Sequence, residues 1–180
     1  ILLSMLSLMG VPFQVLMPVF ARDIFYGGPN TLGFLMGMMG VGALIGAYYL
    51  AARKSVIGLV RIAASTAVLF GVSIIVFSFS RSFWFAMPMV LMSGFGAMVN
   101  MAACNTILQT VVDEDKRGRV MSFYTMAFMG TMPFGSLFAG VLATRIGAPY
   151  TLLIGGTCCV LTAFLFMSKL PLIRKGIRQI

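Results

Sequence analysis

Hydrophobic residues fill most of this chain in long runs that are separated by five short breaks of polar, Gly or Pro residues. The breaks lie at residues 21–30, 53–58, 80–82, 113–119 and 144–149. A helix needs about 20 apolar residues to cross a bilayer. The pattern therefore predicts an all-α membrane protein with six transmembrane helices. We expect these spans at about residues 1–20, 31–52, 59–79, 83–112, 119–143 and 149–168.

The composition supports a lipid environment. Hydrophobic residues make up 60% of the 180 residues and charged residues 9%, whereas soluble domains have about 45–50% and 25%. This excludes a soluble enzyme and a secreted disulfide scaffold. The chain contains no histidine, which removes Ser/His and Cys/His triads and His-based metal sites. We expect no enzyme activity, no catalytic residues, no metal and no cofactor.

Positive charges predict the orientation in the membrane. Ten of the 13 Lys and Arg residues follow the second and fourth spans or lie in the C-terminal tail, and Arg22, Arg81 and Arg145 lie in the other loops. Loops rich in Lys and Arg stay in the cytoplasm. Both termini are therefore expected in the cytoplasm, with the protein in a bacterial inner membrane. This placement accounts for most of the net charge of +9, so we expect membrane lipid as a partner and no nucleic acid.

An internal repeat relates the two halves of the chain. Met36-Gly37-x-Met39-x-x-Gly42-x-Leu44 matches Met129-Gly130-x-Met132-x-x-Gly135-x-Leu137 after a shift of 93 residues. The shift maps the second span onto the fifth and the third onto the sixth. Three spans is an odd number, so the second copy would cross the membrane in the opposite sense. The sequence thus predicts two inverted three-helix repeats, an arrangement known from secondary transporters.

Two further segments resemble the major facilitator superfamily of transporters. The first is Asn105-x-x-x-Gln109-x-Val-Val-Asp-Glu-Asp-Lys116-Arg117-Gly118-Arg119-Val-Met-Ser with Gly135-Ser-Leu-Phe-Ala-Gly140. It is similar to the tenth and eleventh helices of the branch that holds enterobactin-type siderophore exporters and macrolide efflux proteins. The second is Leu16-Met-Pro18-Val-Phe-Ala-Arg22-Asp23 with Gly42-Ala-Leu-Ile-Gly46. It is similar to the seventh and eighth helices of that branch.

The resemblance covers residues 1–180 as the C-terminal half, helices seven to twelve, of a twelve-helix transporter. It implies export of small molecules by alternating access between the two sides of the membrane. The chain starts at Ile1 without an initiator Met, so we expect a piece of a longer protein. Its partners would be the missing N-terminal six-helix half, or a second copy when isolated, together with a small-molecule substrate.

Methionines indicate where substrate would bind. Fifteen of the 16 fall in the first, second, fourth and fifth spans, the helices that line the central cavity in the family. Methionine is flexible and suits surfaces that accept many apolar shapes. We expect a cavity without contributions from the third and sixth spans. Its predicted residues are Gln14, Met36, Met98, Asn100, Met101, Asn105, Tyr124, Phe128 and Met132.

Alternatives remain open for several of these residues. Methionine can simply replace leucine in lipid, Tyr124 and Phe128 can serve in packing, and Asn105 and Gln109 can form hydrogen bonds between helices. The acidic residues all lie in loops, whereas ion coupling usually needs a carboxylate at membrane depth. A coupling residue is therefore expected in the missing half. The loop after the fourth span predicts a cytoplasmic gate made by Asp113, Asp115, Arg117 and Arg119.

These patterns favour one half of a secondary exporter of apolar or amphipathic small molecules. The alternative is a six-span channel or lipid-handling protein that acts as a homo-oligomer. A channel would predict a pore motif or a charged ring facing its lumen, and the chain shows neither.

Overall fold

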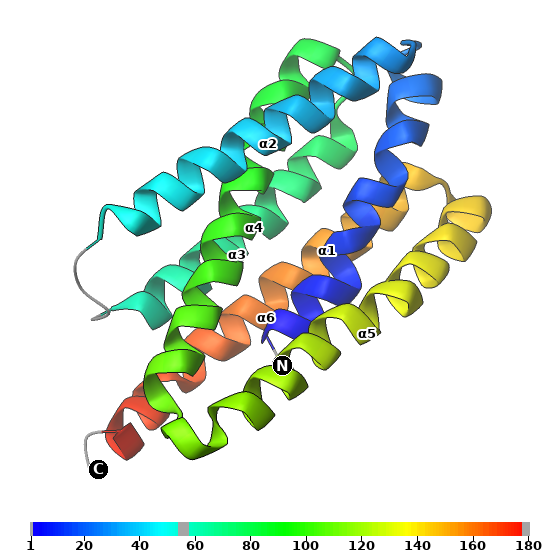
Figure 1. Cartoon of the computed structure of the whole chain (residues 1–180). Helices are drawn as coiled ribbons and strands as arrows, with labels where there is room; N and C mark the ends of the chain where they lie inside the picture. Colours follow the sequence, from blue (N-terminus) through cyan, green and yellow to red (C-terminus); the bar gives the residue numbers. More distant parts are fainter. Residues whose placement is uncertain (1, 54–57, 178–180) are drawn as a thin grey trace.

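The structure, a computed structural model, is a bundle of helices in which consecutive helices run in opposite directions (Figure 1). It describes the backbone of residues 2–53 and 58–177 and the side chains of residues 8, 10, 12–53 and 58–168. The elements in chain order are α1 (Leu2–Val19), the π-helix η1 (Phe20–Ile24), α2 (Pro29–Ala51), α3 (Leu59–Phe79), α4 (Phe83–Val111), α5 (Glu114–Ile146) and α6 (Ala148–Ile177). The predicted cytoplasmic Lys54 and Arg178 and the side chains of Met5 and Met9 lie outside the described residues.

Five of these helices, α2 to α6, are long and apolar enough to cross a membrane. This confirms the all-α membrane class for the described part of the chain. The first span, which corresponds to α1, stays a prediction. One end of the bundle, at the lower left of Figure 1, carries the end of α2, the start of α3, the α4–α5 connection and the end of α6. The other connections lie at the opposite end.

Three predicted breaks are wrong in extent. Of the break at 21–30, residues 21–24 belong to η1 and residues 29 and 30 to α2. Residues 113–119 were expected to form a loop, but the connection consists of Val112 and Asp113, and α5 already begins at Glu114. Acidic side chains at the first turn of a helix stabilise it through the helix dipole, and Glu114 and Asp115 occupy that turn. The break at 144–149 shrinks to Gly147, whose φ of +88° is a backbone conformation that favours glycine.

The helices form two layers. In Figure 1, α3 and α6 lie behind the others. The most extensive packing joins α2 to α4, α3 to α4 and α3 to α6, followed by α1 with α5 and α6. Near one end of the bundle, the buried ring of Phe77 contacts Phe13 and Phe20 at centroid distances of 5.1 and 4.7 Å. This aromatic cluster fixes α1 and η1 against α3.

Glycines permit the closest helix crossings. A Cβ atom at Gly42 would meet the carbonyl oxygen of Leu91, and one at Gly94 would meet that of Met39, so α2 and α4 touch backbone to backbone. The crossing of α3 and α6 is reciprocal. A Cβ at Gly71 would lie 2.9 Å from the carbonyl oxygen of Gly156, and one at Gly156 would lie 2.9 Å from that of Gly71. Small residues bring helices together in this way in membranes.

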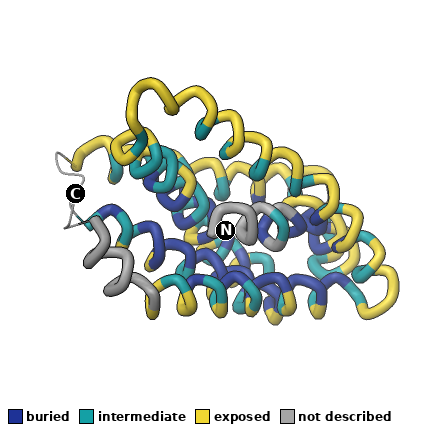
Figure 2. The backbone as a smooth tube through the Cα atoms, turned by 90° about the horizontal axis from the view of Figure 1, so that it is seen from below, coloured by how far each residue is buried: buried dark blue, intermediate teal, exposed yellow. Residues whose placement is uncertain are grey.

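Exposed residues form long continuous stretches on one side of the bundle (Figure 2). In the most apolar 18-residue stretch of each helix, 17% of the residues are buried in α2 and 11% in α5, whereas 56% are buried in α3. Glycines on both helices, among them Gly37 on α2 and Gly130 on α5, have nothing within 4 Å of a Cβ position. The two helices therefore present apolar surface that no described part of the chain covers.

Candidate functional site

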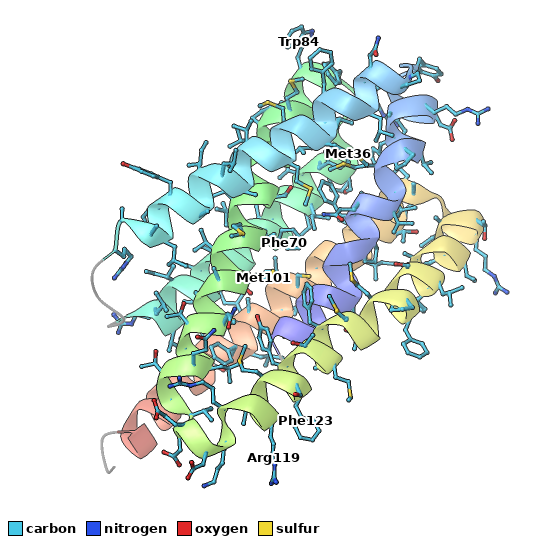
Figure 3. The ribbon with its side chains drawn as sticks, in the orientation of Figure 1. Met36, Phe70, Trp84, Met101, Arg119 and Phe123 are labelled. Atoms are coloured by element: carbon cyan, nitrogen blue, oxygen red, sulfur yellow. The ribbon has the colours of Figure 1, made fainter. Side chains whose placement is uncertain are left out.

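A pocket of about 240 Å³ lies in the middle of the bundle. Residues from α1, α2, α3, α4 and α5 surround it. They are Gly10, Gln14, Met39, Ala43, Phe70, Gly94, Ala97, Met98, Met101, Phe128 and Met132. Figure 3 shows two of them, Phe70 and Met101, at the centre of the molecule.

The surface of this pocket is almost entirely apolar. Four thioethers, two phenyl rings and small residues form the described lining, and Gln14 is its one side chain with an amide. The side-chain nitrogen of Gln14 donates to the sulfur of Met39 at 3.7 Å. Thioether sulfur is a weak acceptor. The amide of Gln14 is therefore available for a stronger hydrogen bond with a bound molecule.

Five of the nine residues predicted for the cavity share this pocket, namely Gln14, Met98, Met101, Phe128 and Met132. Pro12 and Pro18 flank Gln14 on α1. The helical stripe of Met98 and Met101 on α4 faces Phe128 and Met132 on α5 across it. Whether a substrate binds there stays a prediction.

Three other predicted residues lie outside the pocket. Met36 is 49% exposed and lies toward the upper end of the bundle (Figure 3). Asn105 accepts a hydrogen bond from Gln109, one turn away on the same helix, at 2.7 Å. The hydroxyl of Tyr124 donates to the carbonyl oxygen of Met101 at 3.3 Å. The Tyr124 bond links α5 to α4, which otherwise contact each other little.

Asn100 does not line this pocket, and its assignment to the cavity stays a prediction. Its side chain is fully buried, and its amide donates to the carbonyl oxygen of Ala63 on α3 at 2.6 Å. The reason is the helical period: Asn100 lies on the side of α4 that packs against α3. In this structure it therefore joins α4 to α3.

Replacing Asn100 with leucine should remove this bond between helices. Such bonds contribute about 0.6 kcal/mol on average and up to about 1.7 kcal/mol in membrane proteins. We expect Asn100→Leu to destabilise the fold by an amount in that range and to leave the order of preference among substrates unchanged. Thermal unfolding in detergent and a transport profile would measure the two effects. A changed profile at unchanged stability would contradict this assignment.

Phe70 is the pocket residue that sequence reasoning missed. It comes from α3, so the expectation that the third span contributes nothing does not hold for this pocket. Its ring is 3% exposed and approaches the pocket from the rear layer. No sequence signal marks it, because α3 lacks methionines and amides and looks like a plain apolar helix.

The residues predicted for a gate occupy the start of α5. Lys116 lies 3.6 Å from Asp113, and Arg117 lies 4.0 Å from Glu114. Both pairs join residues three positions apart, and both are exposed. Exposed ion pairs of this kind contribute about 0–1 kcal/mol. The structure thus shows local pairs at the helix start, and a gating role for Asp113, Asp115, Arg117 and Arg119 stays a prediction.

A second, larger pocket of about 550 Å³ lies at the end of the bundle away from the start of α5, where η1, the α3–α4 connection and the start of α6 meet. Charged Asp23 and Arg81 line it together with aromatic residues. It lies at the ends of helices and shares no residue with the central pocket. We regard the central pocket as the candidate substrate site because it lies at membrane depth between helices.

A bundle of long apolar helices with an uncharged central pocket is typical of integral membrane proteins that bind small molecules. A family model described as transmembrane secretion effector, a group within the major facilitator superfamily (MFS), matches residues 4–176, and the chain belongs to this family of transporters. The family is one of transporters, not of enzymes.

A curated relative supports the same branch. The chain is 26% identical over 162 residues to the staphyloferrin A transporter of Staphylococcus aureus (strain NCTC 8325 / PS 47). The match covers 89% of this chain and 40% of that relative. The resemblance to the siderophore-transporter branch is therefore confirmed, and the chain spans less than half of that transporter's length.

Proposed function

We propose that this chain is the C-terminal half of an MFS exporter that moves apolar or amphipathic small molecules by alternating access. The observation that carries the proposal is the central pocket, which joins four thioethers and two phenyl rings with a single available amide. Such a surface binds apolar molecules of varied shape. The similarity to a staphyloferrin A transporter supports transport of a small molecule.

The surface supports the proposed orientation in a bacterial inner membrane. Exposed Tyr26, Trp84 and Tyr150 lie at one end of the bundle and exposed Tyr48 and Tyr49 at the other, so aromatic residues mark both interfaces and the basic residues indicate the orientation. Tyr and Trp gather where membranes meet water. The basic residues Lys116 and Arg117 lie at the same end as Tyr48, which is the proposed cytoplasmic side.

The inverted repeat is part of the proposal. The repeat relates α1 to α4, α2 to α5 and α3 to α6. The contact between α2 and α4 therefore corresponds to that between α5 and α1, and the contact between α3 and α4 to that between α6 and α1. All four pairs pack extensively. Gly42 and Gly135, which the repeat aligns, both approach the backbone of a neighbouring helix.

The apolar surface of α2 and α5 supports a missing N-terminal half as the natural partner. When the chain is expressed alone, we expect a second copy to cover this surface and form a dimer. In a background without the native cysteines, Leu137→Cys on α5 should then cross-link two copies in detergent. Leu137 is 68% exposed, and Leu161 on α6, at 62%, provides the matched control. A monomer, or equal cross-linking through Leu161→Cys, would contradict this expectation.

Export can be tested with the whole transporter that contains this chain. Cells that express it should accumulate less N-phenyl-1-naphthylamine, an uncharged apolar fluorescent probe, than cells that lack it. Met101→Trp should restore accumulation because the indole fills the pocket. Met167→Trp is the control, since Met167 is similarly exposed but lies on α6. Equal accumulation with and without the wild-type transporter would overturn the proposal.

A further inference from the structure

Phe70 reaches the central pocket from an unusual position. It belongs to α3, which lies in the rear layer and packs mainly on α4 and α6. The other lining residues come from α1, α2, α4 and α5. Figure 3 shows Phe70 near the centre of the molecule, above Met101 in the view. Because Phe70 is only 3% exposed, a small part of its surface meets the pocket.

Two glycines make room for this side chain. A Cβ atom at Gly10 on α1 would lie 2.6 and 2.9 Å from two carbons of the Phe70 ring. A Cβ at Gly96 on α4 would lie 3.2 Å from the Cβ of Phe70. Contacts below about 3 Å require something to shift. The ring therefore occupies its place because neither α1 nor α4 carries a side chain at these positions.

We propose that Phe70 is the size-determining residue of the substrate pocket. The ring closes the pocket toward α3, and Gly10 sets how far the ring is withdrawn from it. This inference rests on the proposed function, because it assumes that substrate occupies this pocket. It assigns a substrate-selecting role to a helix that otherwise only supports the cavity from behind.

Opposite changes in pocket size follow from substitutions at the two positions. Phe70→Leu removes ring atoms at the closed end, so the pocket becomes deeper. Gly10→Ala keeps phenylalanine at position 70 but adds a methyl group that its ring must move away from, and because Gly10 also lines the pocket, the pocket becomes smaller. In the double variant, the smaller leucine no longer meets the new methyl group as closely. The effect of Gly10→Ala should therefore be smaller in the Phe70→Leu background than in the wild type, whereas two independent sites would give additive effects.

The experiment compares export of two uncharged probes, 1-aminonaphthalene and the larger N-phenyl-1-naphthylamine, by the whole transporter. Differences of one methylene-sized group in an apolar pocket change selectivity by about tenfold or more. We expect Phe70→Leu to shift the ratio of rates about tenfold toward the larger probe. Gly10→Ala alone should shift it toward the smaller probe, and in the double variant the added alanine should change the ratio of Phe70→Leu by less than it changes that of the wild type.

Phe77→Leu is the matched control, because Phe77 is also buried on α3 but does not line the pocket. Its ratio should stay that of the wild type even if its stability falls. Rates are divided by the amount of folded transporter in the membrane, measured by size-exclusion chromatography. Equal ratios for Phe70→Leu and Phe77→Leu, while the wild type exports both probes, would overturn the role of Phe70 alone. A wild type that exports neither probe would overturn the proposed function and this inference together.

Discussion

Gly94→Ala is expected to destabilise the isolated chain by about 1–3 kcal/mol or more, the usual cost of forcing extra atoms into a packed interior. A Cβ at position 94 would meet the carbonyl group of Met39 on α2. A backbone carbonyl cannot rotate away as a side chain can, so α2 and α4 must separate. A lower midpoint of thermal unfolding in detergent would measure the loss.

Gly37→Ala on α2 is the matched control. The same methyl group is added, but nothing lies within 4 Å of the Cβ position at Gly37. Alanine is favoured over glycine inside a helix by about 1 kcal/mol. The midpoint of Gly37→Ala should therefore stay equal to that of the wild type or rise. Equal losses in the two variants would show that the close crossing of α2 and α4 is not what stabilises the fold.

Met98→Ala and Phe128→Ala are expected to change which substrates the whole transporter prefers without abolishing export. Each side chain forms part of the wall of the central pocket. Apolar contacts of this size discriminate between substrates by about 1–3 kcal/mol, so relative rates should change by about tenfold or more. Other walls of the pocket remain in each variant, and substrates that rely on them should still be exported.

A panel of apolar and amphipathic compounds would measure this profile. Met167→Ala serves as control, because Met167 lies on α6 away from the pocket. Its profile should match that of the wild type. Complete loss of export in Met98→Ala with normal folding would indicate a single essential contact and not a tolerant pocket. If only Met167→Ala altered the profile, the central pocket would not be the substrate site.

Much of the architecture could be predicted from the sequence. Long apolar runs separated by polar breaks specify membrane helices, because every backbone polar group in lipid must be paired within the helix. The family follows from the motifs around Arg117 and Gly42. The exact ends of the breaks could not be predicted from the sequence, because Glu114 and Asp115 are as compatible with a first helical turn as with a loop.

The candidate site could be predicted only in part. Met98 and Met101 share a helical face with each other, and that periodicity correctly groups them in one pocket. Asn100 lies between them in sequence but points to α3. An amide at membrane depth is expected to face protein, yet several faces of α4 meet protein. Its residue type therefore could not tell substrate contact from helix packing.

The sequence by itself determined the membrane class, the approximate helix positions and the family, because these depend on composition and on order along the chain. The tertiary structure alone decided which face of each helix meets which neighbour. Helices that are apolar all round carry little amphipathic signal to show their orientation. Phe70 is the clearest case: only the crossing of α3 behind Gly10 and Gly96 brings its ring to the pocket.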